Sequence, residues 1–263
     1  MKAAWTSLLR LVALLVLAVV ALQLYFLLRV ALIVVVDPQS TTFQRSEAWR
    51  LMVEKHQILW SQQWVPYEHI SPQLKRAVIA SEDAAFADHG GVDWEAIEKA
   101  WERNQRAEAR VEKLNEQFER RAAKARVPKG APSRPVARAQ AKVVGGSTIT
   151  QQLAKNLFLD GERSVLRKGQ EFVVTLMLES LLSKRRILEV YLNNVEWGEG
   201  VFGAEAAARH YFHTPAHSLG AMQSAQLAVM LPAPKRFEKR PGSAYVVGRA
   251  GTIAARMGAV ELP

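Results

Sequence analysis

Residues 145–157 read GGSTITQQLAKNL, a glycine turn that leads directly into a helical pattern. Ile149, Leu153 and Leu157 recur at intervals of four residues and predict one apolar stripe on a helix. Free backbone N–H groups at such a helix start suit an anion, but the Gly-Lys-Ser/Thr arrangement of a nucleotide-binding P-loop is absent. Thr148 and Gln151-Gln152 are unusually polar for this position. The alternative is an ordinary helix start, which is a common pattern.

The same helical spacing continues in both directions along the chain. Ser71-Pro72 is typical of a helix start, since a capping residue precedes proline at the first helical position. Alternating strand patterns are scarce, and we find no internal repeat. The sequence therefore predicts a mainly α fold, with helices expected at residues 71–83, 94–118, 148–157, 164–182, 185–193, 204–211 and 218–230.

The 263 residues include no cysteine, which excludes disulfide scaffolds, zinc ribbons and cysteine nucleophiles. The net charge of +10 is unevenly distributed, because residues 1–36 carry +3 and residues 102–142 carry +7. The rest of the chain is neutral and offers no basic face. Nucleic acid is therefore not an expected partner.

The N-terminus carries a long apolar run. Residues 11–28 are apolar apart from Gln23 and Tyr25, and residues 30–36 are apolar again after Arg29. About 20 helical residues cross a bilayer, so we expect one transmembrane anchor, with Arg29 near an interface. Lys2 and Arg10 precede the run, which predicts a cytoplasmic N-terminus and an external body. A signal peptide cleaved near residues 19–21 is the rival interpretation, and the run continues well beyond that point. A buried core helix is disfavoured at this length.

A pair of carboxylates, Glu82-Asp83, ends the first expected helix and is followed by Phe86, His89 and Gly91. This arrangement could position one acid in a cleft. The alternative is a helix end with ordinary surface acids, in which His89 only holds the glycine turn.

Basic residues gather around a second acid of interest, Glu171. Lys155, Arg163, Arg167 and Lys168 could cradle a diphosphate, with Glu171 orienting them or holding a metal ion. The alternative is ion pairing on a helix surface, worth about 0.2–0.5 kcal/mol per pair. Farther on, the glycines of residues 198–203 follow a helix rather than a strand, so a dinucleotide site is rejected.

In this order the clusters resemble the peptidoglycan glycosyltransferase family of bacterial cell-wall synthases. The resemblance covers about residues 67–245 outside the charged stretch, and Gln223 stands where the family usually has an acid. No transpeptidase motif follows, so the chain resembles the monofunctional, membrane-anchored branch. The matching motifs are Glu82, Asp83, Phe86, His89 and Gly91; residues 145–156; Arg167, Lys168 and Glu171; residues 187–212; and Leu219, Ala225, Leu227, Ala228, Leu231, Pro232 and Pro234.

The resemblance implies a lysozyme-like α fold and a lipid-linked substrate, the undecaprenyl-diphosphate disaccharide-pentapeptide called lipid II. It implies that Glu82 is the general base and that Glu171 orients the cations or a divalent ion, Mg²⁺ or Mn²⁺; no organic cofactor is expected. Lys155, Arg163 and Lys168 are the candidates for stabilising the leaving group. The substrate-binding residues that we predict are Asp83, His89, Ser147, Thr148, Gln151, Gln152, Lys155, Asn156, Arg163, Arg167 and Lys168.

We divide the chain into an anchor (1–36), a juxtamembrane connector (37–66), a glycosyltransferase domain (67–245) with a charged insertion (104–142), and a tail (246–263). The insertion is either a solvated helix with a linker or a segment that docks on anionic lipid headgroups. The expected location is the bacterial inner membrane with a periplasmic catalytic domain. The expected partners are lipid II, the growing glycan, membrane lipid and other cell-wall or division proteins. A lytic muramidase-like enzyme and a non-catalytic membrane scaffold are the rival functions.

Overall fold

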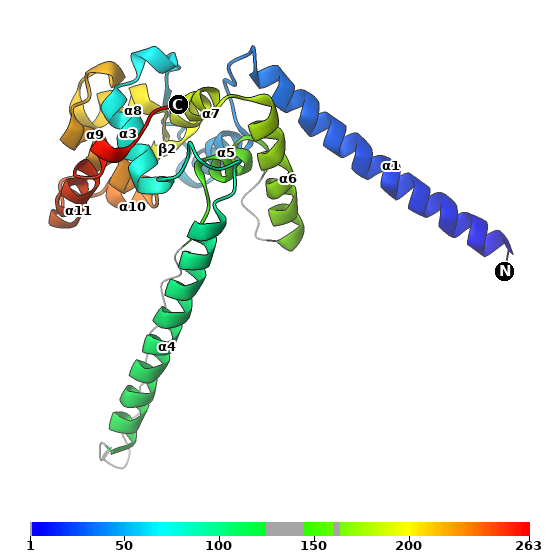
Figure 1. Cartoon of the computed structure of the whole chain (residues 1–263), viewed down its shortest axis with the longest axis horizontal. Helices are drawn as coiled ribbons and strands as arrows, with labels where there is room; N and C mark the ends of the chain where they lie inside the picture. Colours follow the sequence, from blue (N-terminus) through cyan, green and yellow to red (C-terminus); the bar gives the residue numbers. More distant parts are fainter. Residues whose placement is uncertain (1, 125–144, 160–163) are drawn as a thin grey trace. The chain divides into compact units, whose positions relative to one another are not determined.

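A computed structural model describes residues 2–124, 145–159 and 164–263 of the chain (Figure 1). The chain forms two compact units, one of residues 1–92 with 148–263 and one of residues 93–147.

The larger unit is mainly helical, as the sequence predicts. Its small sheet has the order β1-β3-β2, in which β1 runs parallel and β2 antiparallel to β3. The elements are α1 (Lys2–Ile33), α2 (Thr42–Arg50), β1 (Ser61–Gln62), α3 (Pro72–Glu82), α5 (Ile149–Phe158), α6 (Val165–Leu181), α7 (Lys184–Asn194), β2 (Glu196–Gly198), β3 (Val201–Phe202), α8 (Ala204–Phe212), α9 (Ala221–Met230), α10 (Pro234–Phe237) and α11 (Ala244–Ala254), with single turns at Leu51–Lys55, Tyr67–His69, Ala216–Ser218 and Met257–Ala259.

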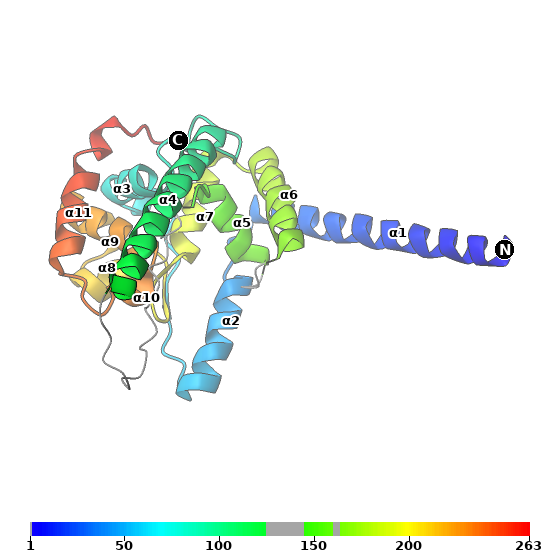
Figure 2. The ribbon, with the colours of Figure 1, turned by 90° about the horizontal axis from the view of Figure 1, so that it is seen from below.

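Helix α7 lies in the core of this unit. Its residues Ile187, Leu188, Val190 and Leu192 are fully buried. It packs against α5, α6 and α8, while α3 packs against α9. Figure 2 shows α6 on the side from which α1 extends and α11 on the opposite side. The central helices therefore hold their polar side chains on a rigid, close-packed frame.

Helix α1 contains the one segment of the described residues that is long and apolar enough to cross a membrane, Ala4–Ile33. The C-terminal part of α1 packs against α5, since the rings of Phe26 and Phe158 lie 5.7 Å apart between centroids. Gln23 also exchanges side-chain hydrogen bonds of 2.8 and 3.0 Å with Gln170 of α6. A polar residue inside the apolar run is thus satisfied by the body of the protein.

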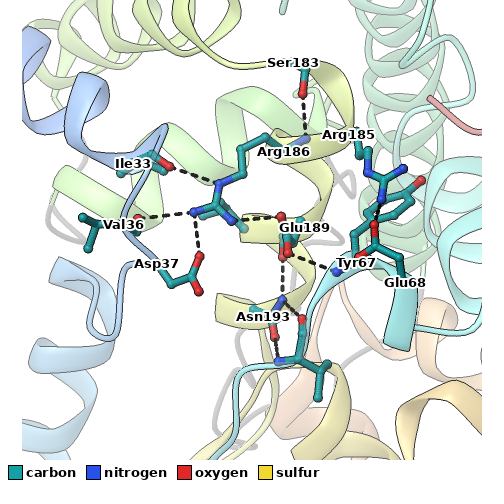
Figure 3. Close-up of polar contacts among 12 residues, drawn as sticks. Ile33, Val36, Asp37, Tyr67, Glu68, Ser183, Arg185, Arg186, Glu189 and Asn193 are labelled. Carbon is teal, nitrogen blue, oxygen red and sulfur yellow. Dashed lines mark hydrogen bonds and ion pairs between the residues drawn. The ribbon is translucent and has the colours of Figure 1, made fainter.

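The end of α1 is fastened to α7 by Arg186 (Figure 3). The guanidinium donates to the carbonyl oxygens of Ile33 at 3.0 Å and Val36 at 3.3 Å, and it pairs with Asp37 at 2.7 Å. Glu189 accepts from the same guanidinium at 2.9 Å. The last carbonyl groups of a helix have no partner within it, so Arg186 caps α1 with a charge of the favourable sign.

The segment that the sequence analysis leaves as a tail, residues 246–263, contains most of α11 (Ala244–Ala254) and contributes several side chains to the core. Val246, Ala250 and Ile253 lie on one face of α11, which packs against α9 and α3. Their i, i+4, i+7 spacing is helical, but the small residues around them weaken the signal.

The smaller unit consists mainly of α4 (Trp94–Lys124), a continuous helix. The predicted insertion therefore begins inside this helix, at residue 104, and its residues 125–142 lie outside the described residues. Trp94, Trp101 and Phe118 are exposed on it.

Candidate active site

Glu82 is the last residue of α3 and is only partly exposed. Its Oε2 accepts a hydrogen bond of 3.1 Å from Nε2 of Gln152, and its Oε1 accepts one of 3.3 Å from the hydroxyl of Ser81. Burial raises the pKa of the Glu82 carboxyl, and the negative charge of Asp83 adds to the rise, while the two hydrogen bonds oppose it. Glu82 is therefore a stronger base than an exposed glutamate.

Asp83 points into the protein and joins the first motif to α5. Its Oδ1 lies 2.8 Å from Nε2 of His89, and its Oδ2 accepts from the backbone N–H of Ile149 at 2.9 Å. The N–H of Gly91 donates to Nδ1 of His89 at 3.1 Å, so the imidazole carries its proton on Nε2. In this structure Asp83 and His89 bind each other and the backbone.

Gly91 closes this turn against α5 and α6. Its carbonyl accepts from the hydroxyl of Thr148 at 2.7 Å, and its φ of +88° is in the left-handed region. A Cβ atom here would lie 2.7 Å from Cγ2 of Thr175 and 2.8 Å from Cγ of Glu179. Only glycine satisfies both the backbone angle and the close approach.

The two adjacent glutamines at the start of α5 have different roles. Gln151 and Thr148 form a capping box, in which each side chain bonds the other's backbone N–H at 3.2 Å. Gln152 instead reaches Glu82, and its Oε1 accepts from the hydroxyl of Tyr191 at 2.8 Å. Tyr191 is absent from the predicted site residues, although it lies in one of the motifs that carry the resemblance.

Glu171 is buried on α6, which packs against α5. Nη1 of Arg167 pairs with it at 3.0 Å, and Nζ of Lys168 forms a second short ion pair. Arg167 is mostly buried, while half of the Lys168 side chain is exposed. In the described parts of the chain, no group of three or more acids or histidines is placed to hold a metal ion.

The remaining predicted residues lie in different places. Lys155 is exposed on α5, one turn after Gln152, and Asn156 beside it is half-buried. Ser147 is exposed and belongs to the smaller unit. Arg163 lies outside the described residues.

Gln223, the departure from the family pattern, is the third residue of α9. Its Oε1 accepts from the backbone N–H of Gly220 at 3.0 Å, which is the glutamine half of a capping box. An acid at this position would accept the same bond, so the departure leaves the helix start intact.

Comparison with known proteins gives matches over most of the chain. The sequence model of a protein family described as Transglycosylase matches residues 52–113 and 131–258. A biosynthetic peptidoglycan transglycosylase of Burkholderia ambifaria (strain MC40-6) is 50% identical over 243 residues, covering 92% of this chain and 86% of the relative. One from Burkholderia orbicola (strain MC0-3) is 51% identical over the same shares, and one from Burkholderia multivorans is 50% identical.

Proposed function

The chain belongs to the transglycosylase family, and from this premise we propose how it acts as a peptidoglycan transglycosylase: it polymerises lipid II into glycan strands, with Glu82 as the general base. The observation that carries this proposal is the position of Glu82, a partly buried carboxylate with a raised pKa that accepts hydrogen bonds from the neutral groups of Gln152 and Ser81. A proton acceptor works best when its pKa approaches the working pH.

In the proposed step the 4-hydroxyl of an acceptor sugar attacks the anomeric carbon of the growing chain. Glu82 takes the hydroxyl proton as the new C–O bond forms. The bond between the anomeric carbon and the lipid diphosphate breaks, and the diphosphate leaves with the electron pair. General-base assistance of this kind contributes about 10²–10⁴-fold to a rate.

Negative charge grows on the departing diphosphate, so fixed cations beside it lower the barrier. Arg167 and Lys168 are the candidates on α6, and Lys155 is the candidate on α5. Glu171 holds the first two through its carboxylate and orients them for the leaving group. The predicted divalent ion does not fit this donor set, because both oxygens of Glu171 are already engaged by cations. In the proposed step the positive charge beside the leaving group comes from Arg167, Lys168 and Lys155.

We assign α1 to the bacterial inner membrane, with the N-terminus in the cytoplasm and the body in the periplasm. Lys2 and Arg10 precede the apolar run, in accord with the positive-inside rule. Because the substrate also carries a lipid tail, a tethered enzyme searches for it in two dimensions, at a higher effective concentration.

The test uses the purified full-length protein with labelled lipid II, and the products are resolved by length. Wild-type protein should make long glycan, and Glu82→Gln should abolish it while the thermal melt shows an intact fold. Glu196→Gln is the matched control, since Glu196 is a buried glutamate on β2 with no assigned role in the reaction. Full polymerisation by Glu82→Gln, or release of short fragments from preformed glycan by the wild type, would contradict the proposal.

A further inference from the structure

Tyr191 is a buried residue of α7 to which the proposed reaction gives no role. Its side chain is 1% exposed, and its hydroxyl donates to Oε1 of Gln152 at 2.8 Å. Burial raises the pKa of this hydroxyl well above its ordinary value, and the negative charges of Glu82 and Asp83 add to the rise. Tyr191 therefore keeps its proton at any pH at which the protein works.

The amide of Gln152 has one accepting end and one donating end. An ionised carboxylate only accepts, so the amide can satisfy Glu82 in one orientation, with Nε2 toward the carboxylate. In that orientation Oε1 faces Tyr191, whose protonated hydroxyl supplies the matching donor at 2.8 Å. If the amide rotated by half a turn, two acceptors would face each other at Glu82, and the Tyr191 hydroxyl would have to turn and accept from Nε2.

We propose that Tyr191 is a positioning residue that locks the Gln152 amide, so that Oε2 of Glu82 always faces a donor and Oε1 is the oxygen that accepts the substrate proton. The inference rests on the proposed function of Glu82 as the base. A protonated Oε2 would direct its proton at the amide N–H, which the lock holds in place. At Oε1 the neighbour is the hydroxyl of Ser81 at 3.3 Å, which can rotate and accept.

The other ionisable groups around Glu82 support this division between its two oxygens. Asp83, on the same segment, is bound by His89 and by the N–H of Ile149. Tyr191 from α7 is neutral and acts on Glu82 through Gln152 from α5. In the described part of the chain, the hydrogen bonds to the Glu82 carboxylate thus come from Ser81 at 3.3 Å and Gln152 at 3.1 Å, and the Gln152 amide is the closer donor.

The test is the pH dependence of kcat/KM for lipid II polymerisation by Tyr191→Phe, which removes the hydroxyl and keeps the ring. Without the hydroxyl, Oε1 of Gln152 loses its donor and the amide is held less firmly against Glu82, so the ionised form of Glu82 loses part of its stabilisation. We expect the acid limb of the profile to move upward by about one pH unit, the shift that corresponds to losing about 1.4 kcal/mol of preference for the charged form. Tyr211→Phe is the matched control and should leave the acid limb in place. Its hydroxyl donates to the Trp197 carbonyl at 2.8 Å and not to Gln152.

Gln152→Met, a variant of similar size without the amide, removes both the hydrogen bond to Glu82 and the one from Tyr191. It should shift the acid limb at least as far as Tyr191→Phe does, and the double variant should shift it no further than Gln152→Met alone. Should Tyr191→Phe fail to fold, Gln152→Met decides, and an unmoved limb overturns the inference.

The failure of this inference can be told apart from failure of the proposed function. If Glu82→Gln is inactive and both Tyr191→Phe and Gln152→Met keep the wild-type acid limb, the positioning role of Tyr191 is wrong and the assignment of Glu82 as the base stands. If Glu82→Gln polymerises lipid II normally, the base assignment is wrong and the lock falls with it.

Discussion

Glu82 and Glu171 are both shielded from solvent, yet the protein supports their charges in opposite ways. Glu82 receives hydrogen bonds from the neutral groups of Gln152 and Ser81. Glu171 is paired with two cations, Arg167 and Lys168. Moving a carboxylate out of water disfavours its charged form unless an opposite charge compensates. In the function that we propose, the support around each acid, and not its burial, separates the proton acceptor from the residue that holds the cations.

The largest effect that this comparison predicts is on the activity of Glu82→Gln. The substitution keeps the shape of the side chain but removes the proton acceptor, so kcat for lipid II polymerisation should fall about 10²–10⁴-fold. Product formation from labelled lipid II measures it. An activity within threefold of wild type would remove Glu82 from the reaction.

The second effect concerns Glu171→Gln, in which Arg167 and Lys168 lose their counter-charge. We expect kcat/KM to fall about 10–100-fold, in line with the loss of a charge-assisted hydrogen bond worth roughly 1.5–3 kcal/mol. Thermal denaturation should also show a less stable fold, because Arg167 is mostly buried and loses its partner. Undiminished stability together with wild-type activity would reduce the Glu171 cluster to a surface ion pair.

A third buried carboxylate, Glu196, sharpens the comparison because it lies outside the proposed site. Burial raises its pKa from 4.5 to about 7, with Glu47 adding to the rise and Lys235, 3.5 Å away, opposing it. A carboxyl with a raised folded pKa binds protons better in the folded state, so stability falls as the pH rises from about 4.5 to about 7. Glu196→Gln should therefore raise the free energy of unfolding at pH 8 by roughly 2–3 kcal/mol and leave it nearly unchanged at pH 4. Denaturant titrations at both values check this. This result would show that a raised carboxyl pKa marks a buried negative charge that its surroundings compensate poorly, whether or not the residue takes part in catalysis.

The smallest effect is on the stability of Glu82→Gln. The same sign applies, since the pKa of Glu82 is raised: its charged form opposes folding above its ordinary pKa. The inactive variant should melt at a higher temperature than wild type at pH 7, and the difference should shrink as the pH falls toward 4. Glu171→Gln should melt lower at neutral pH. Shifts of the same sign in both variants would contradict the contrast between the two acids.

Part of this arrangement could be predicted from local sequence. The sequence predicts the start of α3 at Ser71-Pro72 and the start of α5 near Thr148, because a helix start and an apolar stripe depend on a few neighbouring residues. The acidic and basic clusters were also found from residue type and spacing. Helix α11 is not predicted, because Val246, Ala250 and Ile253 stand among glycines and other small residues that weaken the apolar spacing.

Local sequence is sufficient for most of the longer helices, the apolar N-terminal segment and the residue types available for chemistry, because those depend on neighbours along the chain. Only the tertiary structure decided which partner each acid meets. Gln152 is 70 residues from Glu82 and 39 from Tyr191, and Arg186 is 149 from Asp37. Contacts over such separations are set by how α3, α5 and α7 pack, and packing depends on the shape of the whole core.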